Sequence, residues 1–253
     1  MSDRDPRRVN PAPWTHGRPV RGRTGRPVLP TVGPIDDLGA PPAALAWIEA
    51  ARHESSSIAN LYVSAASLVA LGAPDELVDR TLAAADDERH HVEICLALAR
   101  RAGARDPRLD DDVLGLAGHR RRHDGLVATA VASLLDGVVG ESFLARRCEL
   151  AAERTPSLRA ALGRMAADEA RHAELAVDVV AWCTRRRPWV DADLRLALGA
   201  LASATPRSDV LGPIGDDERA EHGLCTSLDE AEAWSATLVA ADELVAGVRA
   251  AHA

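Results

Sequence analysis

Aromatic side chains are scarce in this chain of 253 residues, making up only 3% of it, with a single Tyr and a single Phe. Strands favour aromatic and β-branched residues, whereas the long segments here are dominated by Ala and Leu, which favour helix. Apolar residues still make up 47% of the chain, enough for a substantial core. The composition therefore predicts an all-α protein with one main domain.

Paired cysteines are also lacking, because the four cysteines are far apart and form no Cys-x-x-Cys motif. This spacing argues against a zinc knuckle, a rubredoxin centre or an iron-sulfur cluster. Reduced thiols in the cytoplasm are the simplest interpretation, and a buried Cys is usually a small apolar residue. Three of the cysteines fall on predicted inner helix faces, where they could line a pocket: Cys95, Cys148 and Cys183.

Positive charge is in deficit, since 30 basic residues face 38 acidic ones and the net charge is -8. This balance disfavours nucleic acid and anionic membranes as partners. No uninterrupted apolar stretch reaches the roughly 18 residues of a membrane span. Arg7 and Arg8 are not followed by an apolar run, so neither a secretory nor a twin-arginine signal is predicted. We expect a cytoplasmic protein with no membrane partner.

Composition divides the chain into three regions. Residues 1–40 are rich in Pro, Gly and Arg and lack helical periodicity, which predicts a flexible, solvated arm. Residues 41–187 carry helical periodicity and should form a four-helix bundle. Residues 188–253 are expected to form a helical extension that packs on the bundle or on a second copy of the chain, so that a homodimer is one arrangement it allows.

The bundle is predicted as two antiparallel hairpins joined by a long crossover. Gly72 and Pro74 mark the first tight reversal, while Thr155 and Pro156 read as the cap and first residue of the fourth helix. A polar connection of about twenty residues between the hairpins is long enough to cross the bundle. The four helices are expected over residues 41–71, 74–101, 124–153 and 156–186.

The extension should contain two further helices. The first covers residues 191–203, and the second begins at Ser227. Ser227 and Glu230 have the spacing of a capping box, and the apolar stripe that follows must cover another surface.

A Glu-x-x-His motif occurs twice, once in the second predicted helix and once in the fourth. Glu88 precedes His91 by three positions, and Glu169 precedes His172 by three. Residues three apart lie on the same helix face, so a carboxylate oxygen and an imidazole nitrogen can reach one metal ion. The two motifs therefore predict two metal positions on facing helices.

The first and third helices each carry a carboxylate inside an otherwise apolar stripe, at Glu54 and Glu141. Glu54 and Glu88 lie about 18 and 16 residues from the Gly72 turn, and Glu141 and Glu169 each lie about 14 residues from Thr155. Because an α-helix rises 1.5 Å per residue, the two members of each pair should lie at the same depth to within about a turn. Buried carboxylates without a counter-charge each cost several kcal/mol, so cations are the simplest compensation. The predicted ligands are Glu54, Glu88, His91, Glu141, Glu169 and His172.

This arrangement resembles the ferritin-like di-metal carboxylate superfamily across residues 41–187. The sequence from Asp168 to His172, Asp-Glu-Ala-Arg-His, is similar to the Asp-Glu-x-Arg-His motif of bacterial multicomponent monooxygenases. The resemblance implies that Glu54 and Glu141 are terminal or bridging ligands. It also implies that Asp87 and Asp168 accept hydrogen bonds from the imidazole NH groups and so fix their tautomers.

The resemblance implies a di-iron oxidoreductase that activates O2 to hydroxylate, desaturate or otherwise oxidise a small organic molecule. Manganese is an alternative to iron, because the same ligands accept either. No flavin or nicotinamide fingerprint occurs, so a separate reductase is expected to supply electrons, and an apolar pocket should adjoin the site. A ferroxidase or iron-storage subunit and a peroxide-scavenging protein are the alternatives, although a tail beyond residue 187 is less natural in a storage shell.

Overall fold

The computed structural model describes residues 40–109, 125–201 and 214–250, and within these ranges every regular element is a helix. The all-α prediction is thus confirmed for the described residues. The predicted arm, apart from Ala40, lies outside them, as does the middle of the crossover.

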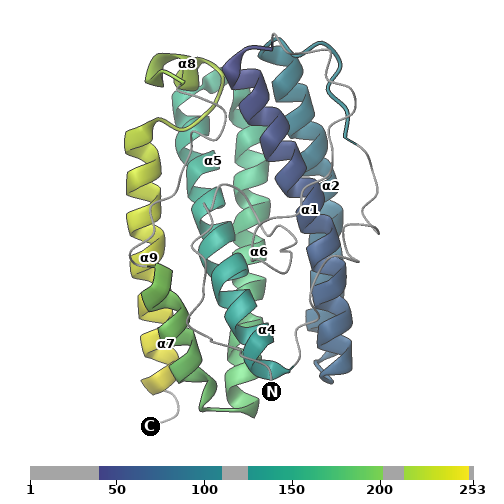
Figure 1. The fold of residues 1–253 in the computed structure, drawn as a ribbon, viewed down its shortest axis with the longest axis vertical. Helices are drawn as coiled ribbons and strands as arrows, with labels where there is room; N and C mark the ends of the chain where they lie inside the picture. The colour runs from purple at the N-terminus through teal and green to yellow at the C-terminus, as the bar shows by residue number, and fades with distance from the viewer. Residues whose placement is uncertain (1–39, 110–124, 202–213, 251–253) are drawn as a thin grey trace, which may run out of the picture.

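Helices α1 (Pro42–Ala70) and α2 (Asp75–Arg101) form an antiparallel pair (Figure 1). The link between them contains Gly72 at a φ of 69°. Its amide donates to the carbonyl of Val69, and the amide of Ala73 donates to the carbonyl of Leu68. This is the Schellman arrangement, which requires a left-handed residue at the position of Gly72. The predicted reversal is therefore present, with α1 ending one residue earlier than expected.

The third predicted helix is interrupted by a different helical form. Helix α4 (Leu126–Ala132) runs into a π-helix, η1 (Ser133–Glu141), which continues as α5 (Ser142–Arg154). The sequence predicted one α-helix here, so that part of the prediction was wrong. A π-helix pairs residue i with i+5 instead of i+4, and such segments are frequent at functional sites.

Helix α6 (Arg159–Arg186) packs along α5 and η1 and also contacts α2. It is preceded by a short 3-10 helix, η2 (Pro156–Leu158), which begins at the predicted first residue with Thr155 at its N-cap position, but the Thr155 side chain makes no cap hydrogen bond. Instead of capping α6, the Thr155 hydroxyl donates to the carbonyl of Ala220, 2.8 Å away. The residue therefore tethers the extension to the bundle.

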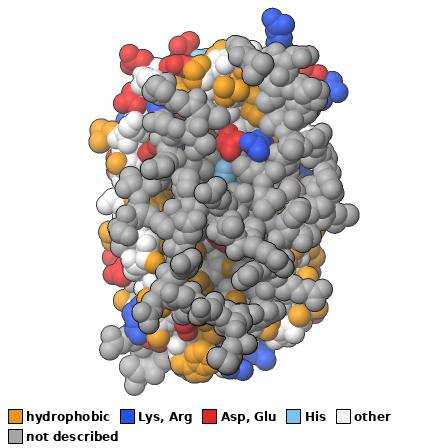
Figure 2. Space-filling view, in the orientation of Figure 1, with side chains coloured by type: hydrophobic (Ala, Val, Ile, Leu, Met, Phe, Trp, Pro, Cys, Tyr) orange, Lys and Arg blue, Asp and Glu red, His pale blue; other side chains and the backbone are white. Residues whose placement is uncertain are grey.

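The extension contains α7 (Val190–Leu201), α8 (Asp216–Glu221) and α9 (Ser227–Ala250). Helix α9 packs against α5 and α7, on the side of the molecule away from α1 and α2 (Figure 1). Helix α8 was not predicted, and acidic side chains gather near it at the upper left of Figure 2. The capping box lies one residue earlier than predicted, because the amide of Asp229 donates to Thr226 Oγ1 and the amide of Thr226 donates to the Asp229 carboxylate.

Two ion pairs, one of them largely buried, fix α9 to α5. Arg147 donates to Glu230 at 2.8 Å, and Arg154 donates to Asp229 at 2.6 Å. Arg147 and Glu230 expose only 11% and 7% of their side chains, so solvent screens this pair weakly.

The combined helix Leu126–Arg154 is long and apolar enough to cross a membrane by length and composition alone, and in this structure 56% of its apolar window is buried inside the protein. Its fully buried Glu141 faces the interior that α6 also lines.

Candidate metal centre

The six predicted ligand side chains meet in the interior, all at the same level along the helices. Five of them expose none of their surface and His172 exposes 3%. They come from four helical segments: Glu54 from α1, Glu88 and His91 from α2, Glu141 from the end of η1, and Glu169 and His172 from α6.

Their ligand atoms form two overlapping groups, within each of which all atoms lie within 4.8 Å of one another. One group contains Glu54 and His91, and the other contains Glu141 and His172. Glu88 and Glu169 belong to both groups. The described side chains can therefore hold a metal ion in either group, with two carboxylates common to the two positions.

Both imidazoles direct Nδ1 into the cluster. His91 Nδ1 lies 3.0 Å from Glu169 and 3.3 Å from Glu88, while His172 Nδ1 lies 3.2 Å from Glu169 and 3.4 Å from Glu88. The two rings are 6.0 Å apart at their centroids. Nδ1 is thus the nitrogen that each histidine offers to an ion.

The opposite ring nitrogens are held by aspartates in a crosswise pattern. His91 Nε2 lies 3.2 Å from Asp168 on α6, and His172 Nε2 lies 3.3 Å from Asp87 on α2. Arg171 donates to both aspartates, at 2.6 Å to Asp168 and 3.2 Å to Asp87. Each motif therefore orients the histidine of the other motif, and the arginine ties the two aspartates together.

The electrostatics show how much negative charge the cluster contains. Burial raises the pKa of Glu54 well above its usual value, and the nearby carboxylates of Glu88 and Glu169 raise it further. Burial acts to lower the pKa of both histidines, but the carboxylates around them outweigh it and raise that pKa. Hydrogen bonds with His172 and His91 correspondingly lower the pKa of Glu88 despite its burial.

The aspartates respond in the same direction as Glu88. The pKa of Asp87 is lowered chiefly by its hydrogen bond with His172. Burial acts to raise the pKa of Asp168, but hydrogen bonds with His91 and Arg171 lower it to about 2. Without an ion, protons on the imidazoles thus supply the positive charge that the carboxylates need.

The donor set suits a divalent cation in either group. Both carboxylate oxygens of Glu54 are buried, and no hydrogen-bond partner for them occurs among the described residues. Unpaired buried oxygens of this kind are rare and call for an explanation. Carboxylate and imidazole ligands together suit iron, manganese or zinc, whereas sulfur-ligated ions would need the thiols that are absent from either group.

A small apolar cavity reaches the cluster at Glu54, as the sequence predicted for a pocket beside the site. Its volume is about 30 Å³, and side chains of α1, α5, α6 and residues 223–225 line it. Of the cysteines proposed for such a pocket, Cys148 lines it, and Cys225 of the extension lines it as well. In this conformation the space holds one or two molecules the size of water.

The extension supplies one wall of that cavity. Trp47 Nε1 donates to the carbonyl of His222, 2.9 Å away. This hydrogen bond fastens the residue just before 223–225 to α1. Gly223 follows at a φ of 73°, and a Cβ there would lie 2.7 Å from a methyl carbon of Leu158. This contribution was missed from the sequence, where Gly223 and Cys225 carry no motif.

Comparisons of the chain with known protein families, with curated proteins and with solved structures give no match.

Proposed function

We propose that this chain is a ferritin-like di-iron oxidoreductase that uses O2 to oxidise a small apolar molecule. The observation that carries the proposal is the pair of overlapping ligand groups that share Glu88 and Glu169 beside an apolar cavity. The predicted hairpin-crossover-hairpin order of the four long helices supports it, because di-metal carboxylate bundles use that connectivity.

Each residue has a defined task in this proposal. Glu88 and Glu169 lie between the two positions, while Glu54 and Glu141 each complete one of them. The aspartate hydrogen bonds keep the proton of each imidazole on Nε2 and leave Nδ1 free to bind an ion. Full burial excludes bulk water from the cluster. Two bound iron ions supply the redox chemistry with O2 that the side chains of this chain lack.

The apolar cavity gives the proposal its substrate class. Leu144, Leu162 and Met165 line it, and the guanidinium of Arg147 is neutralised there by Glu230. O2 and uncharged apolar groups enter such a space at low cost, whereas ions do not. A larger organic substrate requires that the wall at residues 223–225 move. An external reductase remains part of the proposal.

The test is anaerobic loading with ferrous iron followed by metal counting. We expect two ions per chain, falling below one in Glu88→Ala and in Glu169→Ala, because each removal takes a ligand from both positions. Glu93→Ala and Glu174→Ala are matched controls: each lies two residues after a ligand histidine, is exposed, and should leave two ions bound. A single ion in the wild type, or unchanged counts in the ligand variants, contradicts the proposal.

Iron handling is the second candidate, and the polar cavity described below favours it. The loaded chain distinguishes the two functions when ferrous iron is added repeatedly in air. An oxidoreductase keeps two iron ions per chain, whereas a ferroxidase or storage protein oxidises iron far beyond that number and elutes as a large shell on size exclusion.

A further inference from the structure

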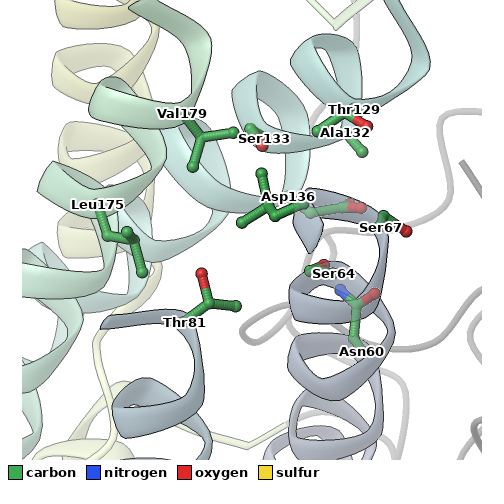
Figure 3. A pocket seen from close by; sticks show the side chains of 11 residues that line it. Asn60, Ser64, Ser67, Thr81, Thr129, Ala132, Ser133, Asp136, Leu175 and Val179 are labelled. Carbon is green, nitrogen blue, oxygen red and sulfur yellow. The ribbon is translucent and has the colours of Figure 1, made fainter. Parts of the chain in front are cut away.

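A second cavity lies on the other side of the metal centre along the helices, and its character is opposite. Its volume is about 20 Å³, enough for one or two waters. Figure 3 shows Asn60, Ser64 and Ser67 following one another along α1, with Thr81 and Asp136 on neighbouring helices. All four bundle segments contribute to its lining.

Two of the hydroxyl groups that line this cavity can offer it only oxygen lone pairs. The Ser67 hydroxyl donates its hydrogen to the carbonyl of Val63, and the Thr81 hydroxyl donates to that of Leu77. Their oxygens can then act only as acceptors toward a ligand. None of the eleven described lining residues is basic, and Asp136 adds a carboxylate. The cavity therefore favours a cation over an anion.

One side chain there lacks a partner. Thr129 exposes 6% of its surface, lines the cavity, and its Oγ1 has no hydrogen-bond partner among the described residues. A buried hydroxyl without a partner costs about 1–3 kcal/mol, so a polar occupant is expected.

The π-helix connects this cavity to the metal centre. In an α-helix, Asp136 and Glu141 would point about 140° apart. Within η1 they are joined by the i to i+5 spacing, which returns both to a similar face. On α1, Ser57, Asn60 and Ser64 continue from Glu54 at spacings of three and four, which also lie on one face. Asn60 is about 9 Å along the helix axis from Glu54.

We infer that the polar cavity is a transit site for a hydrated divalent cation, with Asp136 as its charged ligand, through which ions reach the metal centre. The inference rests on the proposed function of that centre. Oxygen ligands from carboxylate, amide and hydroxyl groups suit such a cation while it retains part of its hydration. From the cavity, the cation then moves past Asp136 on η1 to Glu141, and past the polar side chains of α1 to Glu54.

The test follows the rate at which the ion-free chain takes up Co²⁺, by rapid mixing and the absorption of protein-bound Co²⁺. In Asp136→Asn we expect uptake at least about fivefold slower, while the final count stays at two ions per chain, since the removed charge attracts the cation only in transit. Asp178→Asn is the matched control. That residue is exposed on α6 beside cavity-lining Val179 and pairs with Arg80, so its removal should leave the rate unchanged.

Ser64→Leu fills the cavity while keeping Asp136 and should also slow uptake, so the test does not depend on one variant folding. Unchanged rates in both Asp136→Asn and Ser64→Leu overturn the inference and leave the proposed function intact. A wild-type chain that binds no Co²⁺ and no iron overturns the proposed function and this inference with it.

Discussion

The two cavities differ although α1 and α6 line both of them. Along α1, the residues before Glu54 that line the apolar cavity are Trp47 and Ala50. The residues after Glu54 that line the polar cavity are Asn60, Ser64 and Ser67, followed by Leu68. The α1 side chains that line the cavities thus change from apolar to mostly polar at Glu54, a candidate metal ligand. The difference indicates that a bundle can separate the approach of ions from that of apolar molecules by the side chains on either side of one carboxylate.

Ion binding between the cavities should produce the largest effect on stability. At a thousandfold excess over its dissociation constant, a ligand stabilises the native state by about 4 kcal/mol, which corresponds to roughly 10 °C in Tm for a chain of this size. Thermal unfolding followed by circular dichroism, with and without Mn²⁺, measures the shift. An unchanged midpoint at saturating Mn²⁺ and Fe²⁺ would break the comparison, because the cavities would then flank no ion site.

The described part of the extension lines the apolar cavity and not the polar one, so its buried ion pair should contribute to the stability of the apolar cavity's wall. Glu230→Ala removes the carboxylate that neutralises buried Arg147 and should cost about 3 kcal/mol of unfolding free energy. Glu232 lies two residues after Glu230 and forms an exposed ion pair with Arg146. Glu232→Ala breaks that pair and should cost less than about 1 kcal/mol of unfolding free energy. Urea denaturation of the two variants gives both values. Equal costs would show that the extension does not hold this wall through the buried pair.

Acid should weaken ion binding at the centre. The pKa of both histidines is raised in the ion-free chain, so each carries a proton that an ion must displace from Nδ1. Affinity therefore rises with pH, by about tenfold per pH unit for each ion over the range in which the imidazoles remain protonated. Calorimetric titration in two buffers of different ionisation enthalpy should report at least two protons released per chain, because Glu54, whose pKa is also raised, can release a third. Binding without proton release contradicts the charge state deduced for the ion-free cluster.

Filling each cavity in turn should separate the two routes. Ala50→Leu occupies the apolar cavity and should slow reoxidation of the iron-loaded chain by O2 roughly tenfold, equal to about 1.4 kcal/mol, without slowing ion uptake. Ser64→Leu should do the reverse. Stopped-flow measurements of both rates in both variants form the test. If each variant slows both rates equally, the cavities are not separate routes.

The ligand set was readable from the sequence because its signals are local. The spacing of Glu88 with His91 and of Glu169 with His172 fixes which side chains share a helix face. Counting residues from the two turns then placed Glu54 and Glu141 at the same depth, and the structure brings all six together. Which aspartate orients which histidine depends on how α2 and α6 face each other, and no spacing within one helix reports that.

The π-helix and the extension could not be read in the same way. The segment Ser133–Glu141 packs against α6 and contains Gly137 and Gly140, but no local pattern in the sequence marks where i+5 pairing replaces i+4 pairing. The sequence offers two pairs with the spacing of a capping box at the start of α9, Ser227 with Glu230 and Thr226 with Asp229. The structure uses the second pair, and the spacing alone does not distinguish them. The Thr155 hydroxyl does not form the predicted cap hydrogen bond, because it donates to the carbonyl of Ala220, 65 residues further along the chain.

Anomalous diffraction from crystals soaked anaerobically in Fe²⁺ tests the central claim most directly. The account predicts two peaks in the interior, both next to Glu88 and Glu169, with one nearer to Glu54 and His91 and the other nearer to Glu141 and His172. A single peak, or peaks only at surface carboxylates, would contradict it.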